Sequence, residues 1–257
     1  MKKEESRFAD STLFEGMTSI RAVIYAHDNG IGDRIIKRII VDESKKKSRA
    51  KELGWLNFKS GEMGFDIVYV TSDEIDALTT GNTHGGIIAE CSERTIPQLS
   101  ECEIRSGGFY VMIEGIEDPY NFGYALRSLY ACGADGIVLS PRNWMSAAGV
   151  VCRSSAGASE LLPIYESDPA ASAEYFKKHG YRVLCAGIRD SVSSFDCDMK
   201  YPVYLIVGGE KRGISGALLD TADEVVRIDY AVDFGGSLSA ASAASMLGYE
   251  VMRQNRK

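Results

Sequence analysis

The sequence has few of the residues that build metal sites. It contains three histidines in 257 residues, and its six cysteines are scattered without a C-x-x-C pair. Structural zinc sites need closely spaced ligand pairs, so we expect no bound metal. Unpaired, scattered cysteines are typical of reduced thiols in a cytoplasmic protein, and we expect that localisation here. The cysteines are Cys91, Cys102, Cys132, Cys152, Cys185 and Cys197.

Long apolar runs are also missing. No run approaches the roughly 18 residues of a membrane span, and the opening stretch MKKEESRFADSTLF has no apolar segment behind its charges. We therefore expect neither a membrane span nor a secretory signal peptide. The composition, with 45% hydrophobic and 25% charged residues, is ordinary for a soluble globular chain. The length suits one large domain or two modest ones.

The common nucleotide-binding loops are absent as well. The stretch VGGEKRGIS, at residues 207–215, has three glycines and a Lys-Arg pair after the apolar run 203–207. A Walker loop needs Lys and a hydroxyl residue directly after its last glycine, but Ile214 and Ser215 follow Gly213. The dinucleotide pattern G-x-G-x-x-G is not present either. A glycine turn that carries the carboxylate of Glu210 suits a neutral or cationic ligand better than a phosphate.

The charge is unevenly distributed. The whole chain carries −7, which argues against a generic nucleic-acid binder. Residues 33–59, however, hold nine Lys or Arg against four Asp or Glu, so this segment carries +5 and the remainder −12. Two interpretations stay open: a solvated helix face, or a surface that meets RNA phosphates. The RNA-binding candidates are Lys45, Lys46, Lys47 and Arg49.

Residues 1–95 alternate helical and strand patterns and predict a compact α/β domain. After a polar segment with one proline, residues 96–106, which we interpret as a linker, the pattern changes. Ser72 is expected to cap a short helix, since Ile75 and Leu78 follow at helical spacing. The expected helices are 19–26, 44–56 and 72–80, and the expected strands are 35–41, 66–70 and 85–91.

Residues 107–257 predict a second α/β domain. Its strands are too apolar to be half-exposed, and helical patterns separate most of them, which is typical of a mostly parallel sheet covered on both faces. Ligands of such sheets bind beyond the carboxyl ends of the strands, where the glycine turn at 208–213 lies. The expected strands are 108–115, 136–140, 161–166, 181–187, 203–209 and 224–229, and the expected helices are 122–132, 170–179 and 239–253.

Three stretches of the second domain, taken in order, resemble the SpoU/TrmH family of SPOUT RNA methyltransferases. NFGYALRSLYACGADGIVLSPR, from residue 121, is similar to the family's first motif, LIVGGEKRGIS, from residue 205, to its second, and IDYAVDFGGSLSAASAASMLGYE, from residue 228, to its third. Each motif alone is modest, but three in this order are specific. The first domain, which ends in THGGIIAEC, is similar to the family's L30e-like substrate-binding domain, a weaker match.

The resemblance implies a trefoil-knotted parallel sheet, which would be an exception to the rule against threaded chains. It implies S-adenosylmethionine as cofactor, an obligate homodimer, and methyl transfer to a ribose 2′-hydroxyl of ribosomal or transfer RNA, with neither DNA nor a membrane as partner. By motif position, the residues expected to bind the cofactor are Gly208, Ile228, Leu238, Gly187 and Gly213.

For catalysis, the resemblance points to Asn121, Arg127, Glu210 and Ser237. Asn121 is also expected to cap the helix that carries Arg127. The family casts this arginine as a general base, but a guanidinium with a pKa above about 12 is a poor base and an effective clamp for ribose and phosphate. Ser239 is the fifth catalytic candidate, although it departs from the family, whose third motif reads S-L-N where this chain reads S-L-S.

Two other functional classes stay open on the sequence. The Ser239 departure is compatible with a knotted RNA-binding protein that has weak or no methyltransferase activity. A nicotinamide-dependent oxidoreductase on a doubly wound sheet is disfavoured, because its glycine fingerprint is absent. The sequence names neither the RNA nor the nucleotide.

Overall fold

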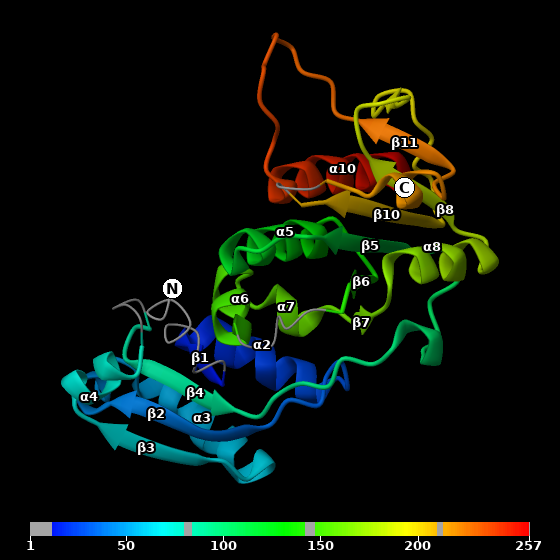
Figure 1. Cartoon of the computed structure of the whole chain (residues 1–257). Coiled ribbons are helices and arrows are strands. Elements are labelled where there is room, and N and C mark those ends of the chain that lie inside the picture. Colours follow the sequence, from blue (N-terminus) through cyan, green and yellow to red (C-terminus); the bar gives the residue numbers. More distant parts are fainter. Residues whose placement is uncertain (1–11, 80–83, 142–146, 210–212, 257) are drawn as a thin grey trace. The chain divides into compact units, whose positions relative to one another are not determined.

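The computed structural model describes residues 12–79, 84–141, 147–209 and 213–256 (Figure 1). The chain forms two compact units. The first comprises residues 1–95 together with 143–161, and the second comprises residues 96–142 together with 162–257. Among the described residues, no helix is long and apolar enough to span a membrane, and no group of three or more His, Cys, Asp or Glu residues could hold a metal ion.

The first unit contains a four-stranded sheet in the order β1-β4-β2-β3. Strand β2 runs parallel to β3 and antiparallel to β4, which in turn pairs antiparallel with β1. The carboxyl ends of β2 and β3 and the beginning of β4 therefore meet at one edge. The strands are β1 (Leu13–Glu15), β2 (Ile36–Asp42), β3 (Asp66–Val70) and β4 (Ile87–Cys91).

Among the described residues, the first unit has four helices before β4 and two more from the later stretch that joins it. The short helix α4 is capped by Thr71, whose side chain and that of Glu74 form a capping box, so the expected cap at Ser72 is wrong by one residue. The helices are α2 (Gly16–Asp28), the 3₁₀ helix η1 (Glu43–Lys45), α3 (Ala50–Met63), α4 (Ser72–Ala77), α6 (Ala148–Ser154) and α7 (Ala158–Leu161).

Helices α6 and α7 pack within the first unit, although we expected the second domain to run unbroken from residue 107. The contacts are close. A methyl group on Gly149 would lie 2.0 Å from the Leu13 carbonyl oxygen, so α6 and β1 meet without room for a side chain. Buried Arg34 forms an ion pair with Glu160 of α7, at 2.9 Å. Such long-range packing has no local signature, so the sequence patterns did not indicate it.

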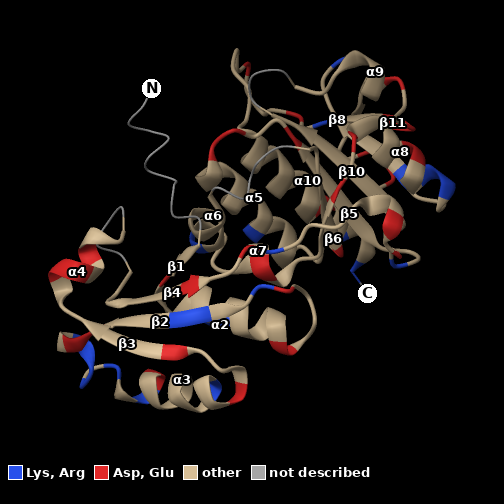
Figure 2. Ribbon diagram, turned by 60° about the horizontal axis from the view of Figure 1, so that its bottom comes forward, with Lys and Arg blue, Asp and Glu red and all other residues tan. Residues whose placement is uncertain are grey.

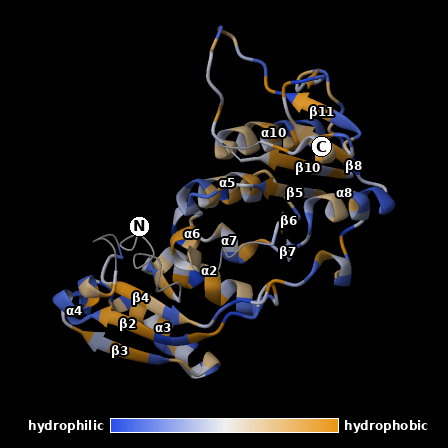
Figure 3. Cartoon of the chain, viewed as in Figure 1, coloured by the Kyte–Doolittle hydropathy of each residue, from blue (hydrophilic) through white to orange (hydrophobic). Residues whose placement is uncertain are grey.

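The second unit is built on a seven-stranded parallel sheet in the order β7-β6-β5-β10-β8-β11-β9. All six expected strands occur, and the two-residue β9 is additional. Figure 3 shows the central strands as strongly apolar, as expected for a sheet covered on both faces. The strands are β5 (Phe109–Glu114), β6 (Gly136–Leu139), β7 (Ile164–Glu166), β8 (Arg182–Ala186), β9 (Val192–Ser193), β10 (Val203–Gly208) and β11 (Glu224–Arg227).

Helices cover the two faces of this sheet. On one face, Tyr204 and Ile206 of β10 belong to a buried cluster with Phe176 of α8 and Leu218 of α9. Neighbouring strand residues point to opposite faces, so Leu205 points to the other face, on which α10 contacts β10 and packs beside α5 (Figure 1). The helices are the 3₁₀ helix η2 (Leu99–Glu101), α5 (Pro119–Ala131), α8 (Pro169–Lys178), α9 (Gly216–Leu219) and α10 (Ala240–Asn255). The expected knot stays a prediction.

Candidate active site

A pocket of about 520 Å³ lies at the carboxyl ends of β8, β10 and β11. Parallel strands present their carboxyl ends at one edge of the sheet, where ligands of α/β proteins bind. The pocket contains all five residues expected to bind the cofactor, together with Ser237. Its lining residues are Ala186, Gly187, Ile188, Val207, Gly208, Gly209, Gly213, Val226, Arg227, Ile228, Asp229, Tyr230, Phe234, Gly236, Ser237, Leu238, Ala240, Ala243 and Leu247.

The glycines after β10 allow backbone segments to come close together. A methyl group on Gly208 would lie 2.5 Å from the Gly213 carbonyl carbon, and one on Gly209 would lie 2.2 Å from the Gly115 oxygen. Gly213 has a φ of 60°, in the left-handed region that glycine tolerates best, and its N–H donates to the Gly209 carbonyl at 3.0 Å. The pocket wall here is therefore bare backbone. Glu210 lies outside the described residues.

A polar network joins two of the loops around the pocket. Arg227 donates from Nε to Asp229 at 2.7 Å and from Nη1 to the Ser191 carbonyl at 2.6 Å, while the Ser193 hydroxyl donates to the other oxygen of Asp229. The hydrogen bond from Ser193, assisted by Arg227, lowers the pKa of Asp229 below its ordinary value. The pocket thus has an ionised carboxylate at its rim.

The long loop between β11 and α10 forms another wall of the pocket and extends away from the sheet, as the orange trace in Figure 1 shows. Within it, the Leu238 N–H donates to the Tyr230 hydroxyl at 3.2 Å, and the Tyr230 and Phe234 rings lie 5.8 Å apart. Both aromatic side chains, and Val232 beside them, are exposed. The loop ends at Ser239, whose Oγ accepts the Ser242 N–H at 3.1 Å and caps α10.

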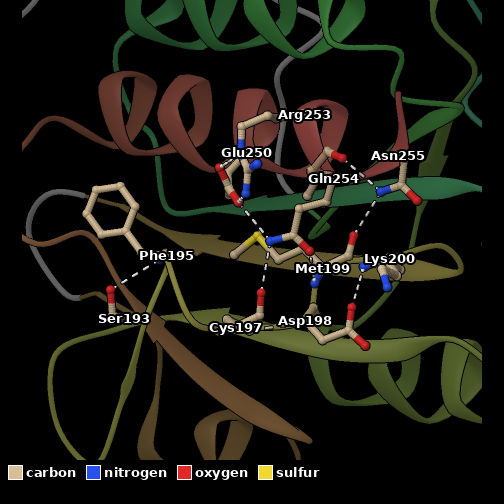
Figure 4. Close-up of polar contacts among 11 residues, drawn as sticks. Ser193, Phe195, Cys197, Asp198, Met199, Lys200, Glu250, Arg253, Gln254 and Asn255 are labelled. Carbon is tan, nitrogen blue, oxygen red and sulfur yellow. Dashed lines mark hydrogen bonds and ion pairs between the residues drawn. The ribbon is translucent and has the colours of Figure 1, made fainter. Parts of the chain in front are cut away.

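The other end of α10 holds the chain segment that leads into β10 (Figure 4). The Gln254 side chain accepts the Met199 N–H at 2.8 Å and donates to the Cys197 carbonyl at 2.9 Å. The Asn255 side chain accepts the Tyr201 N–H at 2.9 Å and donates to the Met199 carbonyl at 3.0 Å. One helix therefore borders the pocket with its first turns and fixes the approach to β10 with its last.

The structure does not bring all the expected catalytic residues into the pocket. Asn121 lies in the first turn of α5, where Asp118 is the cap and accepts the Asn121 N–H at 2.8 Å, so the expected capping role of Asn121 is wrong. Arg127 lies further along α5, is exposed, and makes no hydrogen bond or ion pair within the described part of the chain. Ser237 lines the pocket, and Ser239 serves as the helix cap.

The four RNA-binding candidates lie together after β2 in the first unit, where Figure 2 shows the basic turns before α3. Lys45, Lys46 and Lys47 are exposed. Lys46 lies over the Tyr69 ring, with Nζ 3.7 Å from the ring centroid. Arg49 donates from Nε to the Gly85 carbonyl at 2.8 Å and pairs with Glu52 through Nη1. The segment is thus a structured turn rather than one face of a helix.

Sequence patterns missed several lining residues, of which Arg227 and Asp229 are the most polar. These two flank Ile228 at a strand end, and alternation places them on the same side of the chain. A charged pair at positions i and i+2, on either side of a predicted cofactor residue, could therefore have indicated from the sequence that both charged residues line the pocket. Ile188 and Phe234 have no comparable signal, because loop conformation alone brings them to the pocket.

Comparison with known proteins identifies the class that this fold and pocket define. Residues 108–249 match the model of the SpoU rRNA Methylase family, and residues 20–97 match the model described as RNA 2′-O ribose methyltransferase substrate binding. The chain belongs to the SpoU rRNA methylase family. It is an RNA methyltransferase whose methyl donor is S-adenosylmethionine, as the resemblance implied.

Individual relatives agree with the family match. The chain is 28% identical over 230 residues to a putative TrmH family tRNA/rRNA methyltransferase of Bacillus subtilis, covering 86% of this chain and 90% of that protein. It is 31% identical over 232 residues to one of Staphylococcus haemolyticus, covering 88% and 92%. The AdoMet-bound rRNA methyltransferase from Sinorhizobium meliloti has the same fold, with a TM-score of 0.75 at 23% identity over 98% of this chain and 90% of that one.

Proposed function

We propose that the protein methylates a ribose 2′-hydroxyl of ribosomal or transfer RNA. The observation that carries this proposal is the pocket at the carboxyl ends of β8, β10 and β11, which gathers residues of the second and third motifs around backbone glycines. The match of residues 20–97 to a substrate-binding model named for 2′-O ribose methyltransferases supports the ribose as the acceptor.

The pocket fits S-adenosylmethionine. Its volume of about 520 Å³ lies within the range of small-molecule sites, roughly 300–1,000 Å³. Ile228 and Leu238 offer apolar contacts, and the bare backbone at Gly208 lets a planar group approach closely. Arg227 and Asp229 are the charged residues of the described lining, and their ion pair leaves it without net charge, so the pocket has no excess of cations to attract an anionic ligand. When bound, the cofactor supplies an electrophilic methyl group on a positively charged sulfur.

Arg127 is the residue that we assign to the RNA. It is exposed, it has no competing partner among the described residues, and its guanidinium can bind a phosphate and an adjacent ribose oxygen together. Its part is to hold the ribose with the 2′-hydroxyl in line for attack, since orientation contributes a large share of such rate enhancements. Ser237, in the pocket wall, has a hydroxyl that could orient the acceptor.

The homodimer is proposed to form through α5 and α10. These two helices pack side by side, and their outer faces expose large apolar side chains, which supports an interface there. The exposed residues are Tyr120, Tyr124, Tyr130, Met246 and Tyr249. Arg127 lies three residues from both Tyr124 and Tyr130, so the proposed dimer places it beside the partner subunit, where it would hold RNA at the edge of the interface. Tyr249→Glu should shift the mass found by light scattering from dimer to monomer. The control Tyr25→Glu changes a similarly exposed tyrosine of α2 and should leave the dimer intact; a monomeric wild-type protein would contradict the assignment.

The first unit is proposed to bind the RNA through Lys45, Lys46, Lys47 and Arg49. Replacing Lys45 and Lys47 by alanine should weaken RNA binding, and each lost phosphate contact should reduce the salt slope by about 1, without changing cofactor affinity. Alanine is preferred to glutamate at these positions, because glutamate would add repulsion from the phosphates to the loss of the lysine contact. An unchanged salt slope would assign these lysines to an ordinary solvated surface.

The site of methylation is the decisive test. The protein is incubated with total RNA and S-adenosylmethionine labelled in the methyl group, and the product RNA is digested with alkali. Alkaline cleavage uses the 2′-hydroxyl as its nucleophile, so a 2′-O-methylated nucleotide stays joined to its neighbour as a labelled dinucleotide. Label in mononucleotides would mean base methylation. No label, with RNA binding retained, would favour the second candidate: an RNA-binding protein whose Ser239 replaces the asparagine of an active enzyme.

A further inference from the structure

A second cavity lies in the first unit, at the edge where β2 and β3 end and β4 begins. Its volume is about 690 Å³, in the size range of sites for a single small molecule or nucleotide. It shares no residue with the pocket of the second unit, since all the residues that line it belong to the first unit. Its lining residues are Asp42, Lys45, Ser48, Arg49, Glu52, Ser72, Asp76, His84, Gly85 and Gly86.

The basic side of this cavity is held in place before any ligand arrives. Arg49 is fixed through Nε by the Gly85 carbonyl and through Nη1 by Glu52, and no described residue accepts a hydrogen bond from Nη2, which can therefore bind a ligand. Two consecutive glycines in the left-handed region make this possible: a methyl group on Gly85 would lie 2.6 Å from Arg49 Nη2, and one on Gly86 would lie 2.8 Å from Lys45 Cγ. Both cationic side chains therefore rest directly on the backbone.

The acidic side is held equally well. The Gly86 N–H donates to His84 Nδ1 at 3.1 Å, so this nitrogen carries no proton, and Nε2 donates to Asp76 Oδ1 at 2.8 Å. His84 is buried, whereas the Asp76 side chain is 47% exposed, and its second oxygen accepts no hydrogen bond from the residues that the structure describes. Hydrogen bonds from Ser44 and Ser72 lower the pKa of Asp42 below its ordinary value. The described lining thus combines ionised carboxylates with cations.

This balance of charges decides the class of ligand. Three carboxylates, from Asp42, Glu52 and Asp76, oppose the two cations of Lys45 and Arg49, so an isolated phosphate ion would meet net repulsion. A ligand that carries an anion at one end and N–H donors at the other satisfies both sides. An unstacked RNA nucleotide is such a ligand, because its phosphate accepts and its base edge donates.

We propose that this cavity binds one unpaired nucleotide of the substrate RNA, with the phosphate on Lys45 and Arg49 and the base edge on Asp76. The best match is a guanine, since its adjacent ring N–H and amino group can donate to both oxygens of one carboxylate, whereas the other bases offer a single donor group on that edge. This nucleotide is distinct from the one that is methylated. The inference rests on the proposed RNA-binding role of the first unit and adds to it a preference for one base.

The test uses the full-length protein and RNA hairpins with the five-nucleotide loop UUXUU, where X is guanosine, inosine, adenosine or uridine. Inosine differs from guanosine only by lacking the amino group. Fluorescence anisotropy should show about tenfold tighter binding of the guanosine loop than of the inosine loop, the typical effect of one hydrogen bond to a charged acceptor. Asp76→Asn keeps an oxygen for His84 but loses the second acceptor, so this ratio should fall to about 1–2.

Lys45→Ala and two control variants separate the base preference from the RNA-binding role on which it rests. Lys45→Ala should weaken the binding of all four loops equally. Asp66→Asn and Lys37→Ala replace exposed residues outside the cavity, Asp66 at the opposite end of β3, and should change neither the affinity nor the ratio. If Lys45→Ala weakens binding but wild type shows no preference for guanosine, or Asp76→Asn keeps it, the base assignment is wrong and the RNA surface stands. If Lys45→Ala has no effect on any loop, both fail.

Discussion

Gly208→Ala tests whether bare backbone forms the wall of the cofactor pocket. The added methyl group would lie 2.5 Å from the Gly213 carbonyl carbon and 2.7 Å from the Ile214 nitrogen. Ordinary contacts between such atoms need about 3.5–4.0 Å, so the glycine turn would have to move by roughly 1 Å. Both neighbours are backbone atoms, which cannot swing aside as a flexible side chain would.

The expected cost can be stated as an affinity. Forcing an extra methyl group into a well-packed site costs about 1–3 kcal/mol. If the displaced turn is the one that contacts the cofactor, this cost falls on the bound state, and the Kd for S-adenosylmethionine rises roughly 5- to 150-fold. Isothermal titration calorimetry measures this directly, and circular dichroism verifies that the variant is folded.

Gly216→Ala is the matched control. Gly216 begins α9, its φ is not positive, and a methyl group there would meet no atom within 4 Å. The control should bind the cofactor as wild type does, and should gain about 0.4–1 kcal/mol of stability from a less flexible unfolded chain. A folded Gly208→Ala protein with the wild-type Kd would refute the proposed wall.

Three further substitutions test other parts of the molecule. Arg127→Ala should lower the methylation rate about 10²- to 10³-fold without changing cofactor affinity, because Arg127 does not line the pocket, and Arg127→Lys should restore little; near-full activity in the rate assay would remove it from the site. Ser239→Ala should cost about 1 kcal/mol in denaturant unfolding through loss of the α10 cap, whereas Ser239→Asn, which can also cap, should not; equal losses would contradict the capping role. Gly149→Ala should destabilise the first unit by 1 kcal/mol or more, on the order of other overpacking changes, while Gly54→Ala, in open space on α3, should stabilise it by about 0.5–1 kcal/mol; equal melting temperatures would argue against the close contact of α6 with β1.

The sheet of the second unit was predictable because its strands are continuous apolar runs. Buried parallel strands need apolar residues on both faces, so residues 109–114 and 203–208 contain five buried positions each and no alternation to confuse with a helix. The short strands β1 and β9 lack this signal, since two or three residues are too few to show a period. Strands β1 and β9 form because they pair with strands β4 and β11, which lie far from them in the sequence.

Helix caps were predicted to the right turn but not to the right residue. In the stretch before α5, Asp118 and Asn121 can both cap, and the discriminating feature is Pro119, which favours the first helical position and so marks the residue before it. Before α4, the pair Thr71 and Glu74 has the spacing of a capping box, a stronger signal than Ser72 alone. Both observed caps, Asp118 and Thr71, could therefore have been predicted from neighbouring residues in the sequence.

The pocket was predictable in position and only partly in composition. The glycines of the second motif locate it at a strand end, because backbone segments that come this close together require glycine. The contacts of Asp229 with Ser193 and Arg227 depend on how two loops meet. The cavity between Arg49 and Asp76 is similar, since η1, α4 and the Gly85-Gly86 turn converge there from three parts of the chain. No periodic pattern encodes such convergence.

The position of β10 in the sheet constrains the order in which the second unit is assembled. This strand lies between β5 and β8, yet it follows both in the sequence. During synthesis, β5, β6 and β7 can pair with one another, but β8 cannot join them until residues 203–208 have left the ribosome. The pocket borders β8 and β10 and is closed by the first turns of α10. A nascent chain that stops before residue 203 therefore has three paired strands with an apolar edge at β5, and needs protection there until β10 arrives.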